Sequence, residues 1–273
     1  MENKKTEYAF KRYEELVFSD DFMFGRVMQD ERLCHDVLEC LLQEPVGKLL
    51  EITAQRIFSY TKKGKPVRFD IYAGDDKRVY DSEIQNLNKQ TVESLCLEKR
   101  SRFYQSSIDT DHMNKKGLYK NLPDSVIMFI CTFDPMGKGL ARYTFRERCE
   151  EDDRIYLNDG TEKIFYNCTY TGKDIPGDLK KLYEYITTGK VSDNLTKRID
   201  SKVKEVRKRE EWRSEYMKEM VLLMDAKEEG REEGREEERK NTEKERQRAD
   251  SEGRRADKAE ARVRELEALL VAK

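Results

Sequence analysis

The amino-acid sequence predicts an α/β fold, in which helices flank a mixed sheet, followed by a long, charged helical tail. Three observations predict it. Val67–Gln85 reads as two short strands joined by a turn. Ser125–Phe133 is an almost continuous apolar run, which is typical of a central strand buried on both faces. Residues 227–239 are charged except for two glycines, so this segment brings no apolar surface to a core.

Each element follows from the spacing of its apolar residues. A helix is expected over residues 20–43, where apolar side chains recur every three or four positions until Pro45 and Gly47 end the pattern. The later expected elements are a strand at 52–60, the hairpin at 67–85, a helix at 91–108, a strand at 125–133, strands at 141–147 and 163–169, a helix from 178, and a long helix from 194 capped by Asp193 or Asn194. These elements predict three parts: an α/β domain over 1–190, a helical extension over 191–226 and the tail over 227–273.

The tail carries almost no apolar residues after Ala226 until Val263, Leu266 and Leu270, which fit a heptad seam. Glycines inside the helix each cost about 1 kcal/mol, and the pairs of opposite charge recover only a few tenths each. The tail is therefore expected to be a solvated helix or a marginal coiled coil. In the second case it pairs copies of the chain into a homo-oligomer.

Composition limits the possible partners. Charged residues make up 40% of the 273 residues, well above the usual quarter. Of 54 basic and 56 acidic residues, 14 and 16 lie between Asp225 and Lys273, so the rest of the chain carries 40 of each. Without an overall basic field, DNA binding must depend on a local patch.

The six cysteines lack zinc spacing and are expected to be buried thiols. No apolar run is long enough for a membrane helix, and without a signal peptide a cytoplasmic location is expected.

The hairpin concentrates the chemistry. If Asp75 and Asp76 are its two loop residues, Asp70 lies opposite Asp81, with Glu83 diagonal to Asp70 at about 7–8 Å between backbones. Alternation places these three acids on one face, together with Gln85. The opposite face then carries Phe69, Ile71, Tyr80 and Ile84. Facing carboxylates repel one another, and a divalent cation such as Mg²⁺ or Mn²⁺ removes that cost. A solvated strand face is the simpler alternative.

Asp70 followed by Glu83-x-Gln85 on the next strand resembles the PD-(D/E)XK nuclease superfamily. The pattern is most similar to its Rpn branch of recombination-promoting nucleases and transposase-like proteins. The segments that carry the resemblance are FSDDFMFGRVMQDERLCHDVLECLL (18–42), RSRFYQ (100–105), KGLYKNLPDSVIMFICTFD (116–134), LNDGTEKIFYN (157–167), EEWRSEYM (210–217) and KEEGREEGREEE (227–238). The resemblance covers residues 15 to 238 approximately. It implies a restriction-endonuclease-like core and a metal-dependent DNA endonuclease that hydrolyses phosphodiester bonds, linked to recombination or a mobile element.

The resemblance also implies roles for particular residues. Asp70 and Glu83 match the metal-binding acids, and Asp81 is a further candidate ligand. Gln85 occupies the position where the superfamily usually has Lys, which orients the attacking water and offsets negative charge. An additional acid from the first helix corresponds to Asp21 or Asp20.

Three basic residues on the following helix are candidates for binding DNA phosphate: Lys99, Arg100 and Arg102. A solvated helix face is the alternative for all three. The uncharged Gln85 and the balanced overall charge favour a second class of function. In that class the chain keeps the nuclease fold but acts as a catalytically weak or inactive binding, scaffold or regulatory module. His35 and His112 are expected at the surface and outside the site.

Overall fold

The computed structural model describes residues 10–58, 67–86 and 92–271. The chain divides into two compact units, Met1–Arg213 and Ser214–Lys273. The elements of the chain are η1 (Tyr13–Glu15), α1 (Asp21–Met28), α2 (Glu31–Leu42), β1 (Glu51–Phe58), β2 (Val67–Gly74), β3 (Arg78–Gln85), α3 (Val92–Leu95), α4 (Leu97–Lys116), η2 (Tyr119–Asn121), β4 (Asp124–Cys131), β5 (Arg142–Phe145), β6 (Thr161–Asn167), α5 (Gly177–Thr188), α6 (Asn194–Arg207) and α7 (Glu210–Val271).

The first unit is built on a mixed, six-stranded sheet with the order β1-β2-β3-β4-β6-β5. The central pairs β3–β4 and β4–β6 are parallel, whereas β1–β2, β2–β3 and β5–β6 are antiparallel. The central strand β4 is buried from its second residue to its last, as its apolar run predicts. The predicted mixed α/β class is therefore confirmed.

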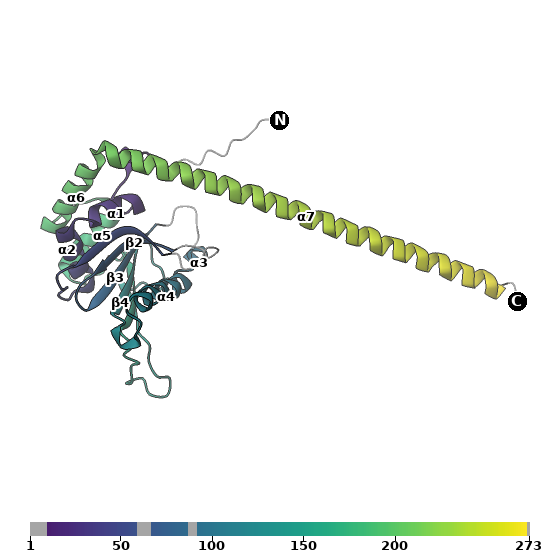
Figure 1. The fold of residues 1–273 in the computed structure, drawn as a ribbon, viewed down its shortest axis with the longest axis horizontal. Helices are drawn as coiled ribbons and strands as arrows, with labels where there is room; N and C mark the ends of the chain where they lie inside the picture. The colour runs from purple at the N-terminus through teal and green to yellow at the C-terminus, as the bar shows by residue number, and fades with distance from the viewer. Residues whose placement is uncertain (1–9, 59–66, 87–91, 272–273) are drawn as a thin grey trace. The chain divides into compact units, whose positions relative to one another are not determined.

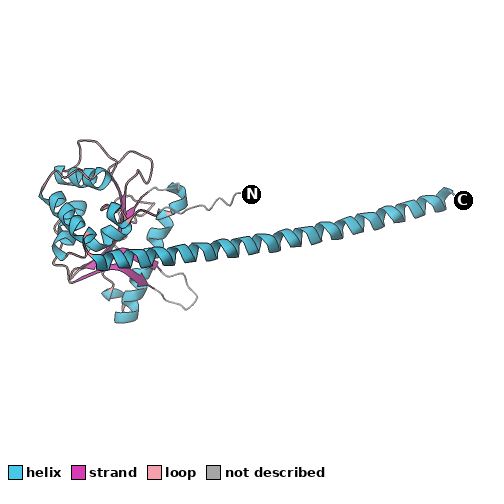
Figure 2. Cartoon of the chain, turned by 90° about the horizontal axis from the view of Figure 1, so that it is seen from above, coloured by secondary structure: helices cyan, strands magenta, loops and turns pink. Residues whose placement is uncertain are grey.

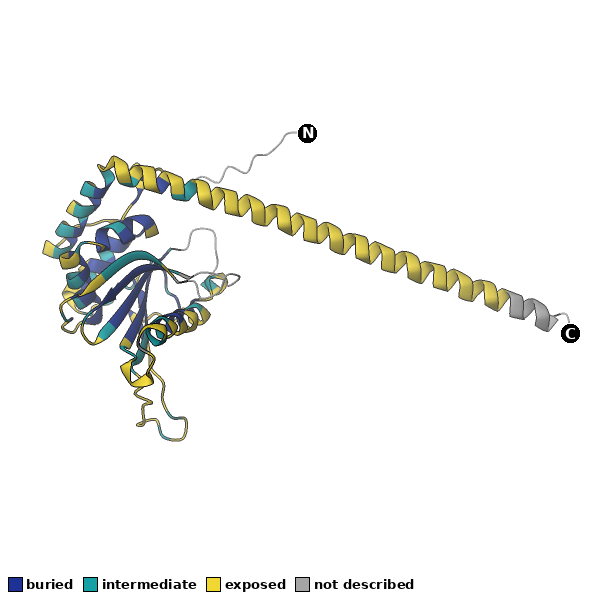
Figure 3. Ribbon diagram, viewed as in Figure 1, coloured by how far each residue is buried: buried dark blue, intermediate teal, exposed yellow. Residues whose placement is uncertain are grey.

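Helices cover both faces of this sheet (Figures 1 and 2). On one face, α4 contributes Leu97, Tyr104 and Ile108 to a core cluster that includes Phe129 of β4 and Phe165 of β6. On the other face, α1 contacts β1, β2 and β3, and α1, α2, α5 and α6 pack against one another. Figure 3 shows the strands buried between these layers. The sheet is thus fixed from both sides at the strands that carry the predicted acids.

Three predicted helices are each divided in two. The helix expected over 20–43 breaks at Gln29, because Asp30 caps α2 by accepting a hydrogen bond from the N–H of Leu33 (3.2 Å). The helix expected over 91–108 breaks at Cys96, which has a left-handed φ of 49°, and α4 then continues to Lys116. Thr91 itself lies outside the described residues.

The long helix expected from 194 ends at Arg207, and α7 starts anew at Glu210. Asp193 caps α6, and its carboxylate accepts a hydrogen bond from the N–H of Thr196 (2.9 Å). In the second unit α7 is helical to Val271, and its residues are exposed from Val221 to Arg264 (Figure 3). In the part of the chain that the structure describes, none of the helices combines the length and apolar character that a membrane crossing requires.

Candidate active site

The β2–β3 hairpin has a different register from the predicted one. Its loop residues are Asp76 and Lys77, because Asp75 pairs with Arg78 through the Asp75 N–H and the Arg78 carbonyl (3.0 Å). The Asp75 carboxylate fixes this turn, since it also accepts the backbone N–H groups of Lys77 (2.8 Å) and Arg78 (2.7 Å). The loop is displaced by one residue, so the register changes by two and the predicted faces of the acids are kept.

The corrected register places the two principal acids level with each other. Tyr72, not Asp70, pairs with Asp81, and the last pair of the β2–β3 ladder is Ile71 with Ser82. Continuing that register brings Asp70 beside Glu83. The predicted diagonal arrangement is therefore replaced by a closer, direct one.

The hairpin opens at these two acids. The N–H of Asp70 donates to Glu83 Oε1 (2.8 Å), and the N–H of Ile84 donates to Asp70 Oδ2 (3.1 Å). Each carboxylate thus accepts a hydrogen bond from the backbone of the facing strand, where a ladder would use a carbonyl. Strand β3 stays paired with β4 as far as Gln85. The gap therefore forms between β2 and β3, with an acid on either side.

The side chain of Phe69 also lies on a different face from the predicted one, since alternation placed it opposite the acids. Its ring lies 4.9 Å from that of Tyr104 on α4 and stacks parallel to Tyr72 at 6.3 Å. Alternation is broken beside Asp70, where the facing residue of β1, Gln55, has a left-handed φ of 52°. The irregularity allows Phe69 to join the core under α4.

A cavity of about 300 Å³ lies at the opening. It is lined by Ser19, Asp20, Asp21, Arg68, Asp70, Glu83, Ile84, Gln85, Asn86 and Arg100. The cavity therefore brings together the predicted Asp70, Glu83 and Gln85, both candidate acids of the first helix, and one of the three predicted basic residues. Only Ile84 among its lining residues is apolar, so the cavity suits a charged or strongly polar ligand.

Burial perturbs both principal acids. Desolvation raises the pKa of Asp70 well above its usual range, and the negative charges of Glu83 and Asp21 raise it further. Desolvation likewise raises the pKa of Glu83, to about 7, although Arg100, the Asp70 N–H and Tyr104 act in the opposite direction. Glu83 is only 1% exposed. An additional positive charge beside the two carboxylates would therefore stabilise their charged forms.

Asp81 does not lie at the mouth of the site. It is fully buried, does not line the cavity, and both of its carboxyl oxygens lack a hydrogen-bond partner among the described residues. Desolvation raises the pKa of Asp81 well above its usual range, and Glu83 and Asp70 add to the effect. Its burial disfavours the charged carboxylate, and it does not lie at the cavity as a ligand.

The two candidate acids of the first helix differ in their contacts. Asp20 binds Lys11 Nζ (2.8 Å) and accepts the N–H of Val17 (2.8 Å), so its carboxylate is engaged by the loop before α1. The Asp21 carboxylate lies 3.5 Å from Arg68 and raises the pKa of Asp70. Because its charge acts on Asp70, Asp21 is the better match to an additional site acid.

The three predicted basic residues separate in the same way. Arg100 lines the cavity, whereas Lys99 and Arg102 are exposed and do not. The sequence reasoning overlooked Arg68, which lines the cavity together with Asp70. It also overlooked Asn86, whose Nδ2 donates to the carbonyl of Ser19 and whose Oδ1 accepts the hydroxyl of Thr132 (2.8 Å). No spacing rule indicated the contact between Asn86 and Ser19, since it joins the end of β3 to the loop before α1.

The oxygen ligands that the cavity offers fit a hard divalent cation. Among the described residues, no group donates a hydrogen bond to Oδ1 of Asp70, a residue that lines the cavity. The acids that line the cavity offer only oxygen ligands, which Mg²⁺ and Mn²⁺ prefer. Burial raises the pKa of both Asp70 and Glu83, and the charge of Glu83 raises that of Asp70 further; a bound cation would favour the charged form of each. Asp70, Glu83 and Asp21 are the residues that would hold it.

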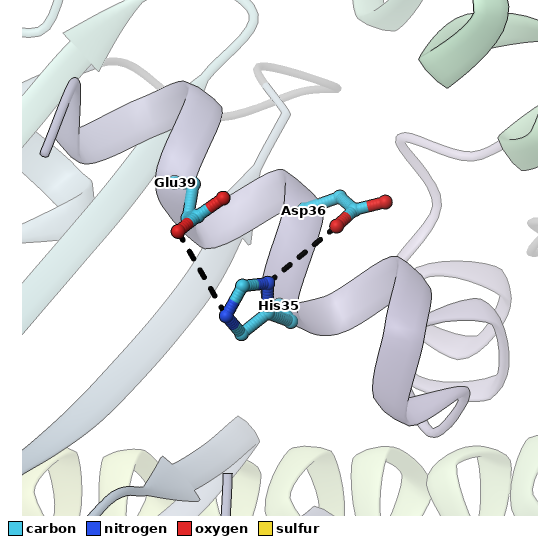
Figure 4. Close-up of side chains that lie close together, drawn as sticks. All are labelled: His35, Asp36 and Glu39. Atoms are coloured by element: carbon cyan, nitrogen blue, oxygen red, sulfur yellow. Dashed lines mark hydrogen bonds and ion pairs between the residues drawn. The ribbon is translucent and has the colours of Figure 1, made fainter. Parts of the chain in front are cut away.

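A second cluster of possible ligands lies on α2 and does not line this cavity. Figure 4 shows His35 between Asp36 and Glu39. His35 Nε2 lies 3.0 Å from the carbonyl of Val46, and Glu39 Oε1 accepts the N–H of Val46 (3.1 Å). Asp36 forms an ion pair with Arg198 of α6. These contacts join α2 to its neighbours and account for the cluster without a metal. His35 and His112 are both half-buried, not on the open surface as predicted.

No protein-family model, curated protein or solved structure matches this chain. The functional conclusion therefore depends on the residues of the cavity and their geometry.

Proposed function

We propose that this chain is a metal-dependent DNA endonuclease of the PD-(D/E)XK type, similar to the Rpn branch. The observation that carries the proposal is the convergence of Asp70, Glu83 and Gln85 on one polar cavity, where β2 and β3 separate. Two buried acids with raised pKa values in a cleft are typical of functional sites. The biological role that we propose is linked to recombination or a mobile element.

Asp70 and Glu83 hold the metal ion in this proposal, assisted by Asp21. Bound Mg²⁺ or Mn²⁺ would lower the pKa of a water molecule and neutralise charge on the phosphate. Asp70 contributes its Oδ1, because its Oδ2 is fixed by the N–H of Ile84. Gln85 lies two residues beyond Glu83 on the same face and also lines the cavity. Its amide can orient a water molecule by hydrogen bonding, although it carries no charge.

Cleavage of plasmid DNA in Mg²⁺, Mn²⁺ or EDTA tests this function. Asp70→Asn and Glu83→Gln should each slow metal-dependent cleavage on the order of a thousandfold, because a loss of several kcal/mol of transition-state stabilisation has that effect. The matched control is Asp152→Asn, which removes a carboxylate that pairs with Arg154 outside the cavity. Its rate should equal that of the wild type. Undiminished cleavage by pure Asp70→Asn protein would contradict the assignment.

A non-catalytic binding or scaffold module is the second candidate function. The observation that favours it is Gln85, which leaves the motif itself without a cation, and the pairing of Glu83 with Arg100 (3.1 Å). In this case the wild type binds DNA but cleaves it in neither metal.

The same cleavage assay on RNA of equal length tests whether the preferred polymer is DNA.

A further inference from the structure

Arg100 touches the proposed motif directly. Its Nη1 donates to Oε1 of Gln85 (2.9 Å), while Nη2 donates to Oε2 of Glu83 (3.1 Å) and to the hydroxyl of Tyr104 (2.8 Å). One guanidinium therefore bridges the acid and the uncharged residue of the motif. It does so from α4, a different element from the hairpin that carries both.

The fold holds Arg100 in this position. The left-handed Cys96 ends α3 and starts α4, and the N–H of Arg100 donates to the Cys96 carbonyl (2.9 Å) in the first turn of α4. The guanidinium carbon lies 5.4 Å from the ring centre of Tyr104 and 5.5 Å from that of Phe129. Two aromatic rings and three hydrogen bonds thus restrict the side chain before any ligand enters.

The second described arginine of the cavity pairs with a different acid, which also lines the cavity. Arg68 lies 3.5 Å from the carboxylate of Asp21. We infer that Arg100 provides the positive charge of this site for a phosphate group, and that Gln85 is its positioning residue, holding the guanidinium through the amide oxygen. This inference rests on the proposed function. It assigns to an arginine on α4 the charge that the motif lacks at Gln85.

A guanidinium suits this role chemically. It stays protonated at any physiological pH and presents its N–H donors as a planar fork, which matches two oxygens of one phosphate. If a bound cation took the charge of Glu83, Nη2 would become available to a phosphate oxygen, while Nη1 would stay on Gln85. The residues that would bind metal and the residue that would bind phosphate are thereby coupled through a single contact.

Gln85→Lys should accordingly lower activity, although Lys is the usual residue of the superfamily at that position. A lysine there would place an ammonium close to the guanidinium, which lies 2.9 Å from the present amide oxygen, and like charges repel. Combining Gln85→Lys with Arg100→Gln removes the repulsion and leaves one cation at the site. The double variant should cleave faster than either single variant.

Binding of a short, fluorescently labelled DNA duplex in Ca²⁺ gives a readout that does not depend on cleavage. Its affinity is measured over a range of salt concentrations for wild type, Arg100→Gln and Arg100→Lys. Loss of one phosphate contact should reduce the slope of log affinity against log salt by about 0.9. Arg100→Gln should show this reduction and cleave about a hundredfold more slowly, as expected on losing one preorganised donor. Arg100→Lys keeps the charge and should keep the slope.

The matched control is Arg154→Gln, which removes the same charge from an exposed residue paired with Asp152. It should leave slope and rate unchanged. An unchanged slope in folded Arg100→Gln protein would overturn the inference, and so would a reduced slope in Arg100→Lys if Arg100→Gln does not fold. Wild type that binds the duplex but cleaves in neither Mg²⁺ nor Mn²⁺ would refute the proposed nuclease function alone, and the slopes would still decide the role of Arg100.

Discussion

Replacing Glu83 with Gln should change how the stability of the protein depends on pH. The pKa of Glu83 is raised in the folded state from 4.5 to about 7. The folded chain therefore retains a proton that the unfolded chain releases between these values. The associated stability is fully present below pH 4.5 and is lost as pH rises through 7. A difference of this size corresponds to about 3 kcal/mol.

Urea unfolding at several pH values between 4.5 and 8 measures this effect. Glu83→Gln should match the wild type near pH 4.5 and exceed its free energy of unfolding by up to about 3 kcal/mol at pH 8. The amide keeps an oxygen that can accept the Asp70 N–H, and Arg100 keeps Gln85 and Tyr104 as partners, so few other contacts change. The exposed Glu98→Gln is the matched control and should run parallel to the wild type.

Adding a divalent cation tests whether the charged form of Glu83 causes this loss of stability. At pH 8, Mg²⁺ or Mn²⁺ at a hundred times its dissociation constant should stabilise the wild type by about 2.7 kcal/mol. The gain should be much smaller in Glu83→Gln, which lacks one of the proposed ligands. If Glu83→Gln loses as much stability as the wild type between pH 4.5 and 8, burial of Glu83 does not have the energetic consequence that its surroundings indicate.

Two further predictions concern the rest of the chain. A maleimide should label Cys96 and Cys149 rapidly in the native protein, because Cys96 is exposed and Cys149 half-buried, whereas the other four cysteines are buried. Mass spectrometry before and after denaturation counts the labelled thiols, and rapid labelling of a third site would show that the core opens. A chain ending at Asp225 should unfold cooperatively and stay monomeric. Val263 is exposed in the single chain, so if α7 pairs copies of the chain, the mass of the full-length protein should rise with concentration in light scattering. Equal monomer masses for both proteins would leave α7 a solvated helix.

The hairpin shows what local sequence can determine. Strand alternation is sufficient to place Asp81, Glu83 and Gln85 on one face of β3, because side chains of a strand point alternately to its two faces. The exact register was missed by one loop residue. It depends on hydrogen bonds from the backbone to the Asp75 side chain, and adjacent aspartates offer equivalent candidates. The faces survived the error, since moving the loop by one residue changes the register by an even number.

Contacts between distant elements could not be predicted from spacing. The helix expected over 91–108 gave no reason to prefer Arg100 over Arg102 or Lys99. The choice depends on where α4 starts, and that is set by the left-handed backbone of Cys96, a residue with no strong preference for such a conformation. The same holds for Asp21, which is distinguished from Asp20 by Lys11 and Arg68, each distant from it in the sequence or in another element.

The energetics of the hairpin bear on the choice between a nuclease and a scaffold. Asp70, Asp81 and Glu83 are all buried, each with a raised pKa, so their charged forms make the fold less stable at neutral pH. A domain that only binds a partner gains nothing from this arrangement, and apolar residues of similar volume are often neutral or stabilising in such positions. A cation would bring positive charge to the buried acids, and a phosphate would then bring negative charge to Arg100, which otherwise pairs with Glu83. The uncharged Gln85 is consistent with that use if it holds the guanidinium in place, which makes the slope of DNA binding against salt for Arg100→Gln the most informative single measurement on this chain.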